Sequence, residues 1–261
     1  MSALLEAKQV SKHFGGLKAV DSVDMTINQG DIFGIIGPNG AGKTTFFNMC
    51  SGIYPITSGE IWLDGENITN MHSEVIARKG MARTFQNIQL FKYMSVLENV
   101  KIGFHIHAKT KIWDSILHSP TYKKDEELAE KKGLEILEKV GLTEFKDTMA
   151  GNLAYGVQRR VEIARALALN PKILLLDEPA AGMNPNETKA LMEFIKKLHK
   201  DGYTIAVIEH DMKFVMNTCN RILVLSFGKK ICEGDPEHVK SDKEVNEAYF
   251  GKGILVREAG M

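Results

Sequence analysis

The stretch DIFGIIGPNGAGKTT, from Asp31 to Thr45, constrains the fold more strongly than any other part of the chain. Its first seven residues are mostly apolar and end in glycine, as in a buried strand, and a helical pattern begins at Lys43. Between them lies the pattern G-x-x-x-x-G-K-T. Glycines let backbone N–H groups turn inward around an anion, and the helix N-terminus adds partial positive charge. This strand–loop–helix unit predicts a phosphate-binding site in an α/β fold.

Nine consecutive residues form the predicted phosphate loop. Its lysine and the hydroxyl that follows suit a nucleoside triphosphate with a magnesium ion. Lys43 would bridge the β- and γ-phosphates, and the Thr44 hydroxyl would ligate Mg²⁺. The predicted nucleotide contacts in this loop are Gly37, Pro38, Asn39, Gly40, Ala41, Gly42, Lys43, Thr44 and Thr45.

Composition excludes several classes of protein. Lys plus Arg and Asp plus Glu each number 33 among 261 residues, so no global positive field recruits nucleic acid. Apolar runs such as ILLL at 173–176 fall far short of the roughly 20 residues of a membrane helix, and the N-terminus lacks a signal-peptide apolar region. Cys50, Cys219 and Cys232 have no paired spacing, which predicts reduced structural thiols. We therefore expect a cytosolic-type chain that cannot span a bilayer alone.

Three buried-type strands follow in the second half of the chain: KILLLDEP, TIAVIEHD and RILVLSFG. They alternate with helical patterns, which predicts a mainly parallel sheet. The first ends in Asp177-Glu178, at the edge where ligands bind in open α/β sheets. Asp177 could hold Mg²⁺, usually through water, and Glu178 could polarise the water that attacks the γ-phosphate. Such pairs are common at solvated strand ends, but the preceding phosphate loop and Pro179 favour the catalytic interpretation.

Other segments differ in character from this βα alternation. The runs LLEAKQVSKHF, AVDSVDMTI and GEIWLDGENIT are typical of strands, and Asp64-Gly65 is a turn signal. The block from about Phe91 to Val161 is helical instead. Within it, DEELAEKKGLEILEKVGL predicts a helix capped by Gly141. The apolar residues near helical spacing on this helix are Leu128, Leu134, Leu137 and Val140.

Together these motifs resemble the ATP-binding subunits of ABC transporters, over nearly the whole chain from Val10 to about Gly234. The resemblance implies that residues 37–45 are the Walker A loop and ILLLDE the Walker B strand. It implies that Gln86, in ARTFQNIQLF, senses Mg²⁺ and the attacking water. It also implies that His210, after TIAVIE, contacts the γ-phosphate and that Phe14, in SKHFGGLKAV, stacks on adenine.

The fold implied by the resemblance is α/β. It comprises a P-loop NTPase core, RecA-like with a mainly parallel sheet, an N-terminal antiparallel β subdomain and an inserted α-helical subdomain. The whole chain, 1–261, would be one ABC ATPase domain. Within it we expect the core and β subdomain at 1–90 and 161–240, the helical subdomain at 91–160 and a C-terminal tail at 241–261.

The stretch LAYGV occupies the position of the family's signature loop, ordinarily LSGGQ. In the family, two subunits pair head to tail and this loop covers the ATP held by the other subunit. Ala154, Tyr155 and Gly156 would thus meet the partner's γ-phosphate, together with the dipole of a helix beginning near Val157. Ala154 replaces a serine, Tyr155 a glycine and Val157 a glutamine, and Asn184 replaces a usual aspartate further along. We expect a head-to-tail dimer that ATP holds together less tightly, rather than an inactive enzyme.

Local features resemble the ATPases of branched-chain amino-acid importers, namely RTFQNIQLFKYMSVLENV, NLAYG and LDEPAAGMNP. The long insertion favours the larger of the two ATPase types. The implied partners are two transmembrane permease subunits, a homologous ATPase or a second copy of this chain, and indirectly an extracytoplasmic binding protein. The implied location is the cytoplasmic face of the membrane. No residue physically points to leucine or urea, so urea or amide importers and a lipopolysaccharide exporter stay open as alternatives.

Two further interpretations belong to other classes. A non-transport ABC ATPase of DNA repair or translation usually has two cassettes or a basic coiled coil, whereas this chain has one cassette and balanced charge. A regulatory module without turnover is disfavoured by Glu178 and His210. The insertion FHIHAKTKIWDSILHSPTYKK places Trp113, Ile116 and Leu117 on one helical face, for partner docking or for packing on its own domain. In the tail, residues 254–256 are candidates for packing on the core.

Overall fold

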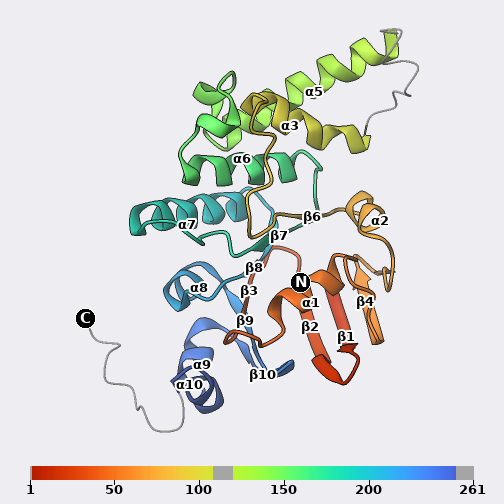
Figure 1. Ribbon diagram of the computed structural model, residues 1–261, viewed down its shortest axis with the longest axis vertical. Helices are drawn as coiled ribbons and strands as arrows, with labels where there is room; N and C mark the ends of the chain where they lie inside the picture. The colour runs from red at the N-terminus through yellow and green to blue at the C-terminus, as the bar shows by residue number, and fades with distance from the viewer. Residues whose placement is uncertain (1, 108–119, 251–261) are drawn as a thin grey trace.

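Two β-sheets of different kinds form the centre of the molecule (Figure 1). The computed structural model describes residues 2–107 and 120–250. One sheet has the strand order β2-β1-β4-β5 and is antiparallel throughout. Asp64 and Gly65, which join its last two strands, both have positive φ, so the predicted turn is confirmed. The strands are β1 (Ala3–Phe14), β2 (Leu17–Asn28), β4 (Ser58–Leu63) and β5 (Glu66–Asn67).

The second sheet is mainly parallel, as predicted. Its order is β10-β9-β3-β8-β7-β6, and only β10 runs antiparallel to its neighbour. Every residue of β3, β7 and β8 is buried, because helices or the other sheet cover both faces. The strands are β3 (Ile32–Ile36), β6 (Met81–Arg83), β7 (Ile173–Asp177), β8 (Thr204–Ile208), β9 (Arg221–Ser226) and β10 (Lys229–Gly234).

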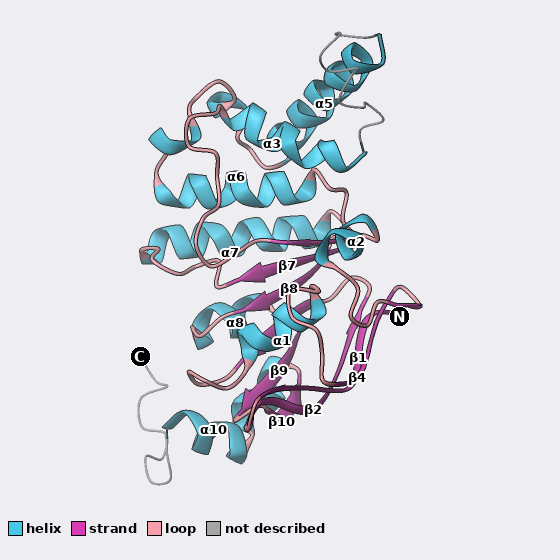
Figure 2. Ribbon diagram, turned by 45° about the vertical axis from the view of Figure 1, so that its right-hand side comes forward, coloured by secondary structure: helices cyan, strands magenta, loops and turns pink. Residues whose placement is uncertain are grey.

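Alternate residues of the parallel strands enter two separate cores. Phe33 and Ile35 pack with α1 (Lys43–Cys50) and the antiparallel sheet, whereas Ile32 and Ile36 pack with helices on the opposite face. Figure 2 shows these layers, with α6 and α7 stacked above the strands. The helices of the second core include α6 (Tyr155–Leu167), α7 (Pro185–Lys200) and α8 (Met212–Thr218).

A helical block at the top of Figure 1 contains α3 (Val96–Phe104), α5 (Pro120–Lys139) and α6. A capping box starts α3, because the Ser95 side chain accepts the Glu98 N–H and Glu98 accepts the Ser95 N–H. After α5, Gly141 has φ +66° and Leu142 N–H donates to the Leu137 carbonyl. The predicted glycine cap is confirmed.

The buried face of α5 follows the apolar spacing of its sequence only in part. Leu128 is 55% exposed, and the residues that face inward are Ala129, Gly133 and Leu137. A Cβ at Gly133 would lie 2.8 Å from Cδ1 of Leu97 on α3. The small residues let the two helices approach closely. Of the apolar residues near helical spacing, Leu137 and Val140 are buried, whereas Leu128 is exposed.

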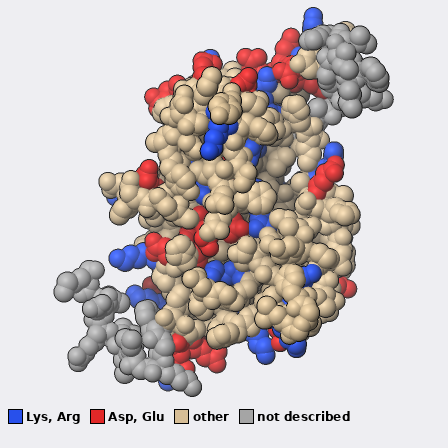
Figure 3. Space-filling model, in the orientation of Figure 1, with Lys and Arg blue, Asp and Glu red and all other residues tan. Residues whose placement is uncertain are grey.

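The remaining helices are α2 (Ser73–Arg78), α9 (Pro236–Ser241) and α10 (Lys243–Phe250). Among the described residues, no helix is long and apolar enough to cross a bilayer. All three cysteines are buried and free, as predicted. On the face in Figure 3, acidic and basic side chains are interspersed, in keeping with the zero net charge. The predicted helical face at Trp113, Ile116 and Leu117 and the predicted packing of residues 254–256 lie outside the described residues.

Candidate nucleotide-binding site

Four neighbouring parallel strands bring the predicted site residues to one edge of the sheet. β3, β8, β7 and β6 are consecutive in the sheet, so their carboxyl ends meet there. The phosphate loop follows β3, His210 follows β8, Asp177-Glu178 ends β7 and Gln86 follows β6. Ligands bind at this edge in open α/β sheets because loops and helix N-termini converge there.

Close packing of the phosphate loop explains two of its glycines. A Cβ at Gly37 would lie 2.1 Å from the Leu225 carbonyl oxygen. Gly42 has φ +96°, and a Cβ there would lie 2.4 Å from the carbonyl oxygen of Ala19 on β2. The loop is thus held between β9 and the antiparallel sheet, and α1 begins immediately afterwards.

Lys43 connects the loop electrostatically to the carboxylates. Its amino group donates to the carbonyl oxygens of Gly37 (2.7 Å) and Pro38 (3.1 Å). Burial lowers the pKa of Lys43, and the charges of Glu178 and Asp177 partly oppose that shift. The next residue, Thr44, is exposed. A phosphate that enters the loop would therefore meet the Lys43 amino group, which lies between the loop carbonyl oxygens and the carboxylates of Asp177 and Glu178.

Glu178 is held in a strained backbone conformation. Its φ is +44°, unusual for a residue with a side chain, and its N–H donates to the Ile208 carbonyl oxygen at 2.9 Å. The carboxylate accepts a 2.8 Å hydrogen bond from the Gln86 amide nitrogen. Two predicted site residues, distant in sequence, are in direct contact.

Sequence reasoning missed the partner of Asp177. The Arg83 guanidinium donates to one Asp177 oxygen at 2.7 Å and to the Ser51 hydroxyl at 2.7 Å. It also lies over the rings of Phe47 and Phe85. Both members of the ion pair are nearly buried. The only available signal was an arginine three residues before Gln86, at the end of an apolar strand.

Glu209 is a second residue that sequence reasoning missed. It is fully buried beside the exposed His210, and burial is the main cause of its raised pKa. Its carboxylate accepts from the Ala180 N–H (2.8 Å) and the His210 N–H (3.2 Å). Glu209 therefore ties together the loops that follow β7 and β8, which carry Glu178 and His210.

A third missed feature joins α6 to the loop that carries Gln86. The fully buried Arg159 donates to the carbonyl oxygens of Phe85 (2.7 Å) and Gln86 (2.6 Å) and pairs with Glu162 at 2.7 Å. Glu162 in turn accepts the Gln89 N–H at 3.1 Å. The conformation of the Gln86 loop is therefore coupled to α6.

The start of α6 lies two residues earlier than predicted. The helix begins at Tyr155 rather than near Val157, with Ala154 as an N-cap that makes no side-chain hydrogen bond. Gly156 lies inside the first turn, where backbone N–H groups lack intrahelical acceptors. A Cβ at Gly182, in the loop before α7, would lie 3.8 Å from the Tyr155 ring. Alanine cannot cap the helix, but the N–H groups still point outward.

Comparison with known proteins places this geometry in a family. Residues 20–181 match the ABC transporter family. The chain belongs to the ABC transporter family. It is an ATP-binding subunit that hydrolyses ATP for transport, as the resemblance in sequence implied.

Individual relatives cover nearly the whole ABC chain. It is 44% identical to the high-affinity branched-chain amino acid transport ATP-binding protein BraF of Pseudomonas aeruginosa, over 95% of this chain and 98% of BraF. It superposes on the ADP conformation of MJ1267, an ATP-binding cassette of an ABC transporter, with TM-score 0.84, 36% identity and 97% and 100% coverage. For the dimeric, ADP- and Pi-bound cassette MJ0796 the TM-score is 0.73, with 28% identity and 89% and 99% coverage. The predicted fold class is confirmed.

Phe14 lies at the end of β1, on the hairpin whose Ala19 contacts the phosphate loop of this ABC subunit. It is 45% exposed and meets Tyr54 edge to face at 5.6 Å. The Lys12 amino group lies 5.0 Å from the ring centroid of Phe14. Part of the Phe14 ring is therefore accessible to solvent.

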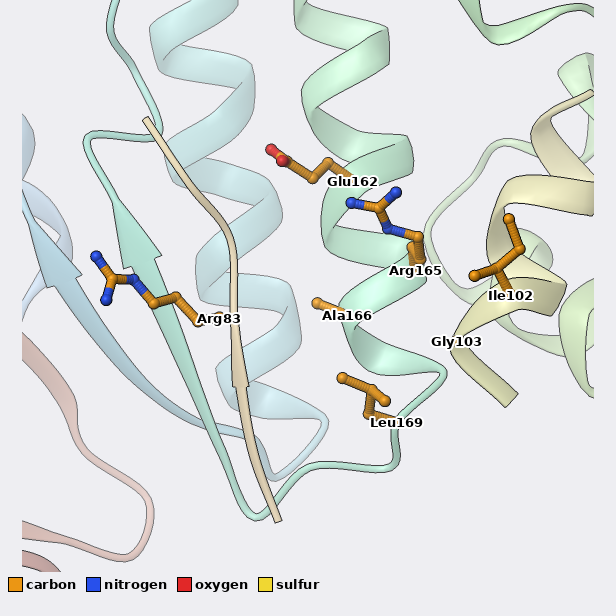
Figure 4. Close-up of a pocket in the computed structure, with 7 residues that line it drawn as sticks. All are labelled: Arg83, Ile102, Gly103, Glu162, Arg165, Ala166 and Leu169. Atoms are coloured by element: carbon orange, nitrogen blue, oxygen red, sulfur yellow. The ribbon is translucent and has the colours of Figure 1, made fainter. Parts of the chain in front are cut away.

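The same ABC subunit has a pocket of about 220 Å³ between α3, α6 and β6 (Figure 4). Arg165 directs its guanidinium towards Glu162, whereas Arg83 turns away from the pocket. Burial lowers the pKa of Arg165. The residues that line the pocket are Arg83, Ile102, Gly103, Glu162, Arg165, Ala166 and Leu169.

Proposed function

We propose that this subunit powers the uptake of branched-chain amino acids such as leucine, isoleucine and valine. The substrate assignment is supported by the 44% identity to BraF, a high-affinity branched-chain amino acid transport ATP-binding protein, over almost the full length of both chains. The chemistry of ATP hydrolysis rests on the geometry of the site itself.

We propose that the loop at 37–45 binds the ATP phosphates and that Phe14 stacks on adenine. Lys43 leaves its backbone acceptors to meet the β- and γ-phosphates, a move that replaces two neutral acceptors by a charged one. Stacking of a base on an aromatic ring contributes about 1–3 kcal/mol. Phe14 therefore affects the affinity for ATP without acting on the γ-phosphate.

The residues at the site fit Mg²⁺. The Thr44 hydroxyl, the Gln86 amide oxygen and the Asp177 carboxylate are oxygen ligands of the kind Mg²⁺ prefers. Arg83 engages one Asp177 oxygen and leaves the other available to the ion or its water. When bound, Mg²⁺ would neutralise charge on the phosphate oxygens.

Glu178 is proposed to accept a proton from the attacking water. It ends a strand at the ligand edge, and its hydrogen bond with Gln86 holds the carboxylate in position. His210, exposed beside Glu209, would contact the γ-phosphate. The buried Glu209 positions the backbone of His210 and takes no direct part in the chemistry.

A head-to-tail dimer would complete each site. The N-terminus of α6, with Ala154, Tyr155 and Gly156, would face the γ-phosphate bound by the other subunit, either a homologous ATPase or a second copy. The dimeric structure of the related cassette MJ0796 supports this assembly. ATP then links the two subunits, and its hydrolysis allows them to separate.

Two transmembrane permease subunits are the proposed membrane partners, at the cytoplasmic face, with an extracytoplasmic binding protein delivering the substrate. Phe91, Tyr93 and Met149 are exposed apolar side chains. They lie in adjoining segments, since Ala150 N–H donates to the Met94 carbonyl oxygen and Gly151 N–H to that of Lys92. This exposed patch beside the helical block suits protein contact.

The decisive test of the enzyme is Glu178→Gln, with Glu193→Gln on exposed α7 as a matched control. We expect the first variant to bind ATP and to hydrolyse it at least about 100-fold more slowly, because the proton acceptor is lost. The control should keep wild-type turnover. Unchanged turnover in Glu178→Gln would remove Glu178 from the mechanism.

Uptake of labelled leucine in a strain lacking the gene tests the substrate. Wild-type protein should restore uptake and Glu178→Gln should not. Restored uptake of urea without uptake of leucine would contradict the amino-acid proposal and leave the ATPase mechanism intact.

A further inference from the structure

Cys232, His238 and Asp242 gather near the C-terminal end of the described chain, and none of them is a predicted nucleotide-site residue. One potential ligand atom from each lies within 4.8 Å of the others. Sulfur, imidazole nitrogen and carboxylate oxygen are the three ligand types that proteins use for zinc. In a tetrahedral zinc site, ligand atoms are about 3.3–3.8 Å apart, as follows from bond lengths of about 2.0–2.3 Å. Small side-chain rotations would bring the three ligand atoms from their present separations of up to 4.8 Å to these distances.

Consecutive elements of the fold bring these side chains together. Cys232 lies in β10, His238 lies in α9 and Asp242 follows α9 directly. His238 and Asp242 are four residues apart, about one helical turn, so they lie on the same side of that turn. The His238 ring packs on Gly234, where a Cβ would lie 2.5 Å from the ring carbon Cδ2. A residue larger than glycine there would displace the ring.

The surroundings favour a cation. The Cys232 thiol is hydrogen-bonded to the Asp242 carboxylate, and the negative charges of Glu233 and Glu244 also act on it. Arg221 and Lys230 pair with Glu233, whereas Asp242 has a carboxylate oxygen within 4.8 Å of the Cys232 sulfur. One Asp242 oxygen accepts the Val245 N–H at 3.0 Å, and a metal ion would replace the thiol proton that now lies between Cys232 and the Asp242 carboxylate.

We propose that Cys232, His238 and Asp242 bind one zinc ion, or a similar borderline transition-metal ion, with water as a fourth ligand. The thiol proton passes to solvent as the sulfur–metal bond forms, and no electron is transferred. Thiolate ligation favours such an ion over Mg²⁺ or Ca²⁺. The bound ion joins the edge strand β10 to α9 and to the start of α10. This role goes beyond the structural thiol expected for Cys232 from sequence.

The test uses the full-length protein without an affinity tag or nucleotide, so that the phosphate loop holds no metal. Zinc binding is measured by calorimetry, and cobalt is substituted as a spectroscopic probe. We expect one equivalent of zinc to bind with a Kd of about 10 µM. Cobalt should give a thiolate-to-metal charge-transfer band that requires a sulfur ligand.

His238→Gln is the main variant because His238 is exposed and its loss should leave the fold intact. His72→Gln, an exposed histidine before α2, is the matched control. We expect His238→Gln to lower zinc affinity by more than about 100-fold, beyond what loss of an outer-shell partner causes. The control should bind as wild type, and Cys232→Ser should abolish the cobalt band.

Absence of zinc binding to wild type, or equal binding by His238→Gln and wild type, would overturn the proposal. A cobalt complex of wild type without a thiolate band would do the same. If Cys232→Ser fails to fold, the wild-type cobalt spectrum and His238→Gln still decide the matter. The outcome is independent of ATP turnover, so it is separate from the test of Glu178.

Discussion

At Ala154, one missing hydroxyl affects both a helix and a ligand contact. Ala154 is the N-cap of α6 and its side chain accepts no hydrogen bond from the helix. A serine there would cap the first turn and would also face the γ-phosphate of a partner subunit. The alanine is therefore expected to weaken both the isolated subunit and the proposed ATP-bound dimer.

We predict that Ala154→Ser raises the stability of the nucleotide-free subunit by about 0.5–2 kcal/mol through capping. In a Glu178→Gln background, we also predict tighter ATP-dependent dimerisation, by about 10- to 150-fold for each of the two sites, from one charge-assisted hydrogen bond per site. Urea unfolding and sedimentation measure the two effects. Ala154→Gly, which favours an N-cap but has no hydroxyl, is the control. A serine variant that dimerises no better than glycine would contradict the contact with the partner's phosphate.

At the scale of elements, α6 is connected to the Gln86 loop through one buried ion pair. Arg159 holds the Phe85 and Gln86 carbonyl oxygens, and Glu162 holds the Gln89 N–H. Motion of α6 must therefore move the loop that contacts Glu178. This connection offers a physical route between the signature loop and the catalytic carboxylate.

We predict that Arg159→Met destabilises the fold by about 3–5 kcal/mol near pH 8, because Glu162 is left buried without its partner. Burial already raises the pKa of Glu162 above its ordinary value of 4.5, and loss of Arg159 raises it further. At pH values between the ordinary pKa of 4.5 and the raised pKa of Glu162 in the folded variant, the folded state keeps a proton that the unfolded state has released. Stability therefore falls as pH rises through this window, and the defect should shrink at pH 5.

Urea unfolding at the two pH values measures the effect of Arg159→Met. The double variant Arg159→Met/Glu162→Met is the control and should recover most of the stability, because no buried charge is left unpaired. A defect in Arg159→Met that did not depend on pH would show that lost packing, rather than the carboxylate, is responsible.

At the scale of the whole molecule, ATP joins loops from both cores, so its binding should stabilise the entire domain. Free energy linkage predicts about 2.7 kcal/mol of added stability at ATP concentrations 100-fold above Kd. Lys43→Met should lose most of this gain because the loop loses its cation. Thermal unfolding with and without MgATP measures it, and Lys196→Met on the exposed face of α7 is the control. An equal ATP-dependent gain in both variants would exclude Lys43 from phosphate binding.

Much of this architecture could be predicted from local patterns. The buried strands KILLLDEP, TIAVIEHD and RILVLSFG, the Asp64-Gly65 turn and the Gly141 cap are confirmed, because apolar runs and glycine conformations are decided within a few residues. Leu128 is exposed although it follows the apolar spacing of α5, and α6 begins two residues before Val157. Which face of α5 is buried depends on a neighbouring helix, because Gly133 lets α5 approach Leu97 on α3.

The order of the motifs along the chain by itself determined the family, the phosphate loop and the candidate residues Gln86, Glu178 and His210. Only the tertiary structure decided which buried groups hold the site residues and the loops that carry them. Arg83 pairs with Asp177 across 94 positions, and Arg159 reaches the Gln86 loop across 73. Cys232, His238 and Asp242 lie within ten residues yet show no familiar spacing, because a strand, a helical turn and Gly234 bring them together. Local conformation depends on neighbours in sequence, whereas buried charges find their partners only when strands and helices pack.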